Sequence, residues 1–177
     1  MLELIYETHA TTTHNESGHA TGWLPGELSG YGREQAVQLG ERRSDVDAVF
    51  SSDLGRALET VAIAFAGTEV PVFYDWRLRE CDYGVLNGAP VGELEMAKHV
   101  DVPYPGGESY RDVVVRVSSF LDDVRRGWDG KRIVVVSHAA PRWALQHLLE
   151  GVPLEELVGA PFDWQPGWEF QLERGGS

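Results

Sequence analysis

The feature that most constrains the fold is a run of four branched apolar residues, Ile133 to Val136, that ends in Ser137-His138. Apolar residues at every position, and not at alternate positions, indicate a strand that is buried on both faces. Strands of that kind lie in the centre of parallel sheets that helices cover on both sides. The run therefore predicts a layered α/β domain, with His138 just beyond the carboxyl end of a central strand.

A second predicted strand, Leu2 to Tyr6, is also followed by a histidine, His9. Ligands of open α/β sheets bind at the carboxyl ends of parallel strands, which share one edge of the sheet, so we expect His9 and His138 to face each other. The hydroxyl groups of residues 11–13 and the amide of Asn15 can hydrogen-bond an anionic oxygen. From position alone, a polar loop with a solvated histidine is an equally good interpretation.

The rest of the chain alternates between helix and strand. Apolar spacing predicts helices over residues 33–43, 54–65, 109–128 and 141–149, and strands over 48–50, 70–74 and 168–172. We expect residues 51–53 to cap the second helix, 76–90 to form a loop, 93–99 a short helical piece and 175–177 a frayed tail. Arg56 lies in the first turn of the second helix, where a cation opposes the helix dipole unless an anion binds beside it. Without a repeat or a linker, residues 1–177 are predicted to form a single three-layer αβα domain.

Composition narrows the classes of partner. The net charge of −13 argues against binding to nucleic acid or to an anionic membrane. No apolar stretch approaches the roughly 18 residues of a membrane span, and no secretory leader is visible. The single cysteine, Cys81, rules out an internal disulfide and fits a reducing compartment. We therefore expect a cytoplasmic protein; the sequence leaves a homodimer open.

Five blocks of residues share a chemistry of anion binding and proton transfer. The blocks are His9 with Thr12 and Asn15; Ser51-Ser52-Asp53-Leu54-x-Arg56-Ala57-x-x-Thr60; Leu78-Arg79-Glu80 with Tyr83-Gly84 and Gly88; Pro105-Gly106-Gly107-Glu108-Ser109; and Ser137-His138. Their order and spacing resemble the histidine phosphatase superfamily, in its phosphoglycerate mutase-like branch. The resemblance runs from the first strand to the helix after His138, and Thr21-Gly22-Trp23 resembles the substrate loop of the mutases.

The resemblance implies a phosphoglycerate mutase-like fold and a phosphatase that needs neither metal nor cofactor and acts on a small phosphorylated metabolite. His9 would attack phosphorus to form a phosphohistidine, and Arg56 with His138 would bind the phosphoryl oxygens. Glu80 would protonate the leaving oxygen and then activate water. The resemblance assigns further substrate or phosphate contacts to Thr8, Thr12, Asn15, Thr21, Gly22, Tyr83 and Arg142. A purely structural alternative for Glu80 is an ion pair with Arg77 or Arg79.

The first block departs from the family, which has arginine where this chain has Thr8. Loss of that guanidinium costs about 3 kcal/mol if its contact strengthens in the transition state, or about a hundredfold in rate. Three explanations compete: another cation replaces it, the enzyme is slow or redirected, or the protein binds phosphate esters without turnover. A mutase remains the second enzymatic interpretation. Segment 88–103 is short, whereas mutases generally have a longer insertion that covers the site. A more open pocket admits water, which favours hydrolysis.

Overall fold

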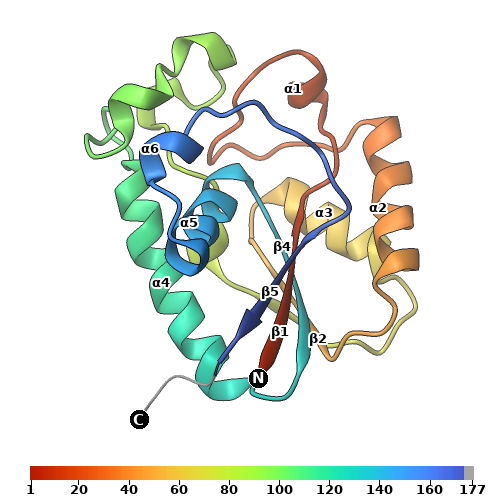
Figure 1. The fold of residues 1–177 in the computed structure, drawn as a ribbon. Helices are drawn as coiled ribbons and strands as arrows, with labels where there is room; N and C mark the ends of the chain where they lie inside the picture. The colour runs from red at the N-terminus through yellow and green to blue at the C-terminus, as the bar shows by residue number, and fades with distance from the viewer. Residues whose placement is uncertain (174–177) are drawn as a thin grey trace.

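The computed structural model describes residues 1–173, so the tail at 175–177 that we expected to fray lies outside the described residues. Five strands form one sheet in the order β3-β2-β4-β1-β5 (Figure 1). They are β1 (Leu2–Thr8), β2 (Ala48–Ser51), β3 (Val72–Tyr74), β4 (Arg132–Ser137) and β5 (Trp168–Leu172). All neighbouring pairs are parallel except β1 with β5. The apolar β4 is the central strand, as its sequence predicts.

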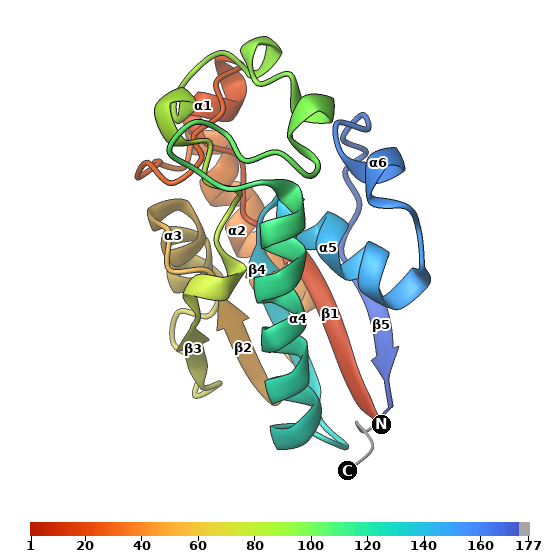
Figure 2. The ribbon, with the colours of Figure 1, turned by 90° about the vertical axis from the view of Figure 1, so that its left-hand side faces the viewer.

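Helices cover both faces of the sheet, which confirms the predicted three-layer arrangement (Figure 2). On one face lie α2 (Gly30–Arg42) and α3 (Gly55–Ala64), and on the other α4 (Tyr110–Gly127) and α5 (Ala139–Glu150). Two apolar clusters follow from the alternation of strand side chains. Ile5 and Val134 pack toward α2 and α3, whereas Leu4 and Val135 pack toward α4 and α5. Within residues 1–173, none of the helices combines the length and apolar character that crossing a membrane requires.

Several element boundaries differ from prediction for identifiable reasons. Helix α2 begins at Gly30 because the Ser29 hydroxyl accepts a hydrogen bond from the Gly32 amide. The expected cap of α3 is absent: its N-cap is Leu54, which provides no side-chain cap. The segment predicted as a loop contains the 3₁₀ turns Trp76–Leu78 and Gly84–Leu86, and two more follow at Val91–Glu93 and Met96–His99. Two one-turn helices, α1 (Thr13–Glu16) and α6 (Leu154–Leu157), were not predicted.

The register of β1 against β4 brings the two histidines together. Thr8 lies opposite Ser137, and the His9 amide donates to the Ser137 carbonyl at 2.8 Å. Directly after β4, the His138 amide donates to the hydroxyl group of Tyr6, a residue of β1, at 3.0 Å. Both histidines therefore emerge at the same edge of the sheet.

Candidate functional site

His9 is held in one tautomer with one ring nitrogen free to act as a base or nucleophile. Its Nδ1 lies 2.7 Å from the Ala10 carbonyl oxygen, which can only accept, so Nδ1 carries the proton. The lone pair is then on Nε2, which accepts a hydrogen bond of 3.3 Å from Nε of Arg56. Burial, and next the nearby Arg56 guanidinium, lower the pKa of His9 to about 3. The imidazole is consequently neutral at neutral pH.

Arg56 is fixed by backbone oxygens that leave its charge uncompensated. Its Nη2 donates to the Gly22 carbonyl at 2.9 Å and its Nη1 to the Leu24 carbonyl at 3.3 Å. Gly22 has a φ of +56°, and a Cβ there would lie 1.9 Å from the Asn87 amide oxygen, so only glycine fits. No carboxylate of residues 1–173 forms an ion pair with the guanidinium, so this buried cation suits an anionic ligand.

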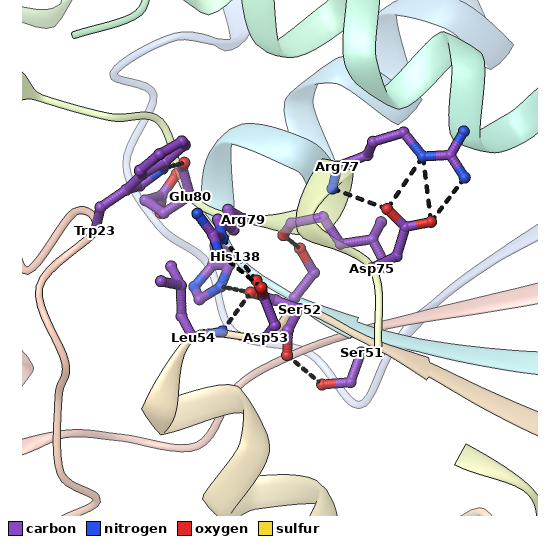
Figure 3. Close-up of polar contacts among 12 residues, drawn as sticks. Trp23, Ser51, Ser52, Asp53, Leu54, Asp75, Arg77, Arg79, Glu80 and His138 are labelled. Atoms are coloured by element: carbon purple, nitrogen blue, oxygen red, sulfur yellow. Dashed lines mark hydrogen bonds and ion pairs between the residues drawn. The ribbon is translucent and has the colours of Figure 1, made fainter. Parts of the chain in front are cut away.

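His138 presents its second ring nitrogen without a partner. Nε2 lies 2.8 Å from the Ser52 hydroxyl, which also accepts from the Leu54 amide (Figure 3). The Ser52 proton has no other acceptor among residues 1–173, so it is donated to Nε2 and leaves Nδ1 protonated. Nδ1 is buried and has no hydrogen-bond partner within the described part of the chain. The two histidine rings are 5.0 Å apart between centroids, which places this N–H donor beside His9.

Glu80 has one oxygen anchored and one oxygen free. Its Oε1 accepts from the amides of Cys81 at 2.9 Å and Ala140 at 3.1 Å, the latter in the first turn of α5. Oε2 has no hydrogen-bond partner among the described residues, and Glu80 lines the cavity that contains both histidines. Trp23 steadies the turn by donating from Nε1 to the Glu80 carbonyl at 2.7 Å (Figure 3). This free oxygen can give or take a proton inside the cavity.

Glu80 does not form the ion pair with Arg77 or Arg79 that the structural alternative predicts. Arg77 pairs with Asp75 and Asp123, and Arg79 forms a two-pronged pair with Asp53 (Figure 3).

A cavity of about 600 Å³ joins these groups at the carboxyl edge of the sheet. Nine of the eleven residues predicted for the site line it: Thr8, His9, Asn15, Thr21, Gly22, Arg56, Glu80, Tyr83 and His138. Thr12 and Arg142 are not in its wall.

Thr12 is a capping residue. Its hydroxyl accepts from the Asn15 amide, and the Asn15 side-chain oxygen accepts from the Thr12 amide and hydroxyl. This capping box uses the oxygen of Asn15 and leaves its NH₂ group for the cavity. Thr12 therefore orients Asn15 and lies outside the cavity wall, and the direct ligand contact expected for it stays a prediction.

Arg142 lies behind the cavity wall and not in it. Its guanidinium is 4.6 Å from the centroid of Trp168 and 5.5 Å from that of Phe162. The residue is 7% exposed, and its side chain has no hydrogen bond to residues 1–173. Burial lowers its pKa, whereas Tyr6 and Glu80 favour the charged form. An unpaired cation thus lies behind the wall, attracted to Glu80.

Two parts of the wall were missed by the sequence analysis. Gln35, Gln38 and Arg42 project from α2 at helical spacing, and residues 159–164, which precede β5, pass over the opening with Phe162 and Trp164. The helical spacing was visible in the sequence, but nothing there showed which face of α2 meets the site. Residues 159–164 carry no motif.

The lowered pKa of His9 makes a prediction about stability. In the unfolded chain this histidine takes up a proton below about pH 6.5, whereas in the folded protein it stays neutral to about pH 3. The unfolded state therefore binds more protons in this window, and the free energy of unfolding falls as the pH is lowered. We expect His9→Gln to gain stability relative to wild type between pH 7 and pH 5, by at most about 1.4 kcal/mol per pH unit. Urea unfolding at pH 7, 6 and 5 measures this; a constant difference would contradict it.

Comparison with known proteins matches residues 8–164 to the histidine phosphatase superfamily, branch 1. Phosphoserine phosphatase 1 of Hydrogenobacter thermophilus is 32% identical over 169 residues, 89% of this chain and 80% of that protein. A probable phosphoglycerate mutase of Salmonella typhi is 30% identical over 165 residues, 86% and 77% of the two chains. The solved structure of a mycobacterial glucosyl-3-phosphoglycerate phosphatase with VO3 has a TM-score of 0.77 at 28% identity and covers 88% of this chain and 85% of that one. The resemblance in sequence is thus confirmed by matches along most of the chain, which belongs to branch 1 of the histidine phosphatase superfamily.

Proposed function

We propose that this protein is a metal-independent phosphatase that hydrolyses a small phosphomonoester through a phosphohistidine at His9. The observation that carries the proposal is the unprotonated Nε2 of His9, which the hydrogen bond from Nδ1 to Ala10 fixes and which faces Arg56. A neutral, oriented imidazole beside a buried guanidinium is the arrangement that nucleophilic attack on an anionic phosphoryl group requires. A phosphatase among its relatives supports the same class of reaction.

The first half-reaction transfers the phosphoryl group to the protein. The Nε2 lone pair forms a bond to phosphorus while the bond from phosphorus to the ester oxygen breaks. Glu80 in its protonated form gives that oxygen its proton, so the product leaves as an alcohol. Arg56, the Nδ1 proton of His138 and the amide of Asn15 donate to the phosphoryl oxygens, where charge accumulates.

The second half-reaction returns the protein to its starting state. The Glu80 carboxylate takes a proton from water, the oxygen of that water bonds to phosphorus, and the bond to His9 breaks. Inorganic phosphate leaves, and Glu80 is again protonated for the next cycle. Because Oε1 is fixed by two amides, the single free oxygen Oε2 serves both steps.

Phosphate release from a panel of phosphomonoesters, with EDTA present and p-nitrophenyl phosphate included, tests the proposal. We expect release by wild type and none by His9→Ala. Interconversion of phosphoglycerates without phosphate release would show a mutase. Binding of phosphate esters without a phosphohistidine would show a binding protein; either result overturns the proposal.

Thr8 gives a prediction about rate. The residue lines the cavity where relatives carry arginine, and the open space there can accommodate a longer side chain. We expect Thr8→Arg to raise kcat for p-nitrophenyl phosphate about tenfold or more, because a bidentate cation would join Arg56 on the phosphoryl group. Thr8→Gln, which is uncharged, is the matched control. A fall in rate for Thr8→Arg alone would contradict the prediction and show that the added guanidinium takes space that the substrate needs.

A further inference from the structure

Two arginines of α2 and its C-cap, Arg42 and Arg43, converge on the buried carboxylate of Glu7. Arg42 donates to it from Nε at 3.1 Å and from Nη2 at 2.8 Å, and Arg43 donates from Nε at 2.8 Å. Glu7 is 2% exposed. Two guanidinium groups thus share this buried carboxylate, and a second carboxylate, that of Glu169, lies 3.9 Å from Arg43 Nη1 and is 61% exposed.

The two arginines face different surroundings. Arg43 is almost buried, and its Nη2 donates to the Pro166 carbonyl at 2.7 Å, so it holds the chain that leads into β5. The Arg42 side chain is 25% exposed and lines the cavity. Its Nη1 has no partner among residues 1–173. Among the described residues, Nη1 of Arg42 is therefore the donor of this cluster that remains for a ligand in the cavity.

The position of Arg42 relative to His9 follows from the first strand. Glu7 and His9 are two residues apart in extended backbone, because the His9 amide continues the pairing with β4. Both side chains point to the face that carries α2 and α3, about 7 Å apart along the strand. Gln35 and Gln38 extend the same polar wall of α2. A substrate whose phosphoryl group lies at His9 can thus reach the donors on α2 with another part of the same molecule.

Apolar side chains also line the cavity. Leu94 and Met96 contribute from the segment after β3, Trp143 from α5, and Phe162 and Trp164 from the chain before β5. A ligand that fills the cavity therefore meets hydrophobic surface as well as cationic and amide groups.

We infer that Arg42 binds a second anionic group on the substrate, so the preferred substrates are phosphomonoesters whose apolar body carries a carboxylate or a second phosphate. Glu7 holds the Arg42 fork in place, and Nη1 donates to the second anion. This inference rests on the proposed phosphatase function and specifies which leaving group it accepts. Arg42 acts on affinity, and the chemistry at His9 is the same with or without it.

Three aryl esters test the inference: unsubstituted phenyl phosphate, 4-carboxyphenyl phosphate and the neutral isostere of the latter, 4-carbamoylphenyl phosphate. We expect wild type to have a KM about tenfold lower for the carboxylated ester than for the carbamoyl ester. Dissociation constants measured by calorimetry on His9→Ala, which keeps the cavity without turnover, should show the same order.

Arg42→Gln should raise KM for 4-carboxyphenyl phosphate to the level of the carbamoyl ester and leave the other two esters within about twofold. Arg42→Lys keeps the charge and loses the fork, so it should lie between. Arg33→Gln is the matched control, because Arg33 is also a cation on α2 but pairs with Glu59 outside the cavity.

The outcomes separate the two proposals. Hydrolysis of all three esters without a charge preference, or an equal loss for all three in Arg42→Gln, would overturn the role of Arg42 and leave the phosphatase standing. Tighter binding of the carboxylated ester to His9→Ala, with no hydrolysis of any ester by wild type, would overturn the phosphatase and leave the anion subsite standing.

Discussion

His9→Ala is expected to lower the rate of phosphate release by about 10⁴-fold or more, because removal of a nucleophile leaves only binding and charge stabilisation. Alanine has no group that can form the bond to phosphorus. The fold should survive, since His9 lies beyond the end of β1 and its side chain is only partly buried. Incubation with a ³²P-labelled ester, followed by denaturation in alkali, should leave label on wild type and none on the variant.

His147→Ala is the control for a lost imidazole. His147 lies near the end of α5, with its ring bonded to the Val152 carbonyl and outside the cavity wall. Its replacement should preserve the label and the rate. Label on His9→Ala equal to that on wild type would assign the phosphorylated residue elsewhere and contradict the mechanism.

Glu80→Gln should separate the two half-reactions. Glutamine cannot supply a proton to the leaving oxygen, so release of a strongly basic alkoxide should slow by about 10²–10⁴-fold. The p-nitrophenolate ion leaves without protonation, so the first step with that ester should continue. Water is then not activated, and the phosphohistidine should accumulate. We expect a burst of about one equivalent of nitrophenolate followed by slow turnover, measured by stopped-flow absorbance.

The comparison of an alkyl phosphate with p-nitrophenyl phosphate is the internal control for this variant. Glutamine keeps the oxygen that accepts from the Cys81 and Ala140 amides, so the turn should stay in place. An equal loss of rate for alkyl and nitrophenyl esters, with no burst, would mean that Glu80 positions the site and does not transfer protons.

The sequence was informative wherever local pattern determines position. A strand that is apolar throughout lies in the centre of a sheet, and a histidine after such a strand lies at its carboxyl edge, so the meeting of His9 and His138 could be predicted. The Thr8 departure was also visible. Because their roles depend on chemistry, the predicted site residues stay predictions until the variants are measured.

Other features of the site depend on tertiary contacts, which the local sequence does not predict. Ser52 appeared to be a helix cap, but its hydroxyl pairs with His138, 86 residues away. Arg42 and Arg43 looked like ordinary cations at a helix end. Their shared partner, Glu7, is 35 and 36 residues away, and the local sequence pattern does not predict that pairing. Phe162 and Trp164 join the wall because the chain before β5 crosses the sheet edge on its way to pair with β1.

The neighbours of β1 bear on how the protein is synthesised. Within residues 1–173, the strand that precedes His9 pairs with β4 and β5, and both partners follow it by more than 120 positions in the sequence. Pairings of such long range form slowly and late. A chain still emerging from the ribosome therefore carries His9 long before it acquires His138 and the wall at residues 159–164. A fragment that ends before β4 lacks both His138 and the strand that pairs with β1.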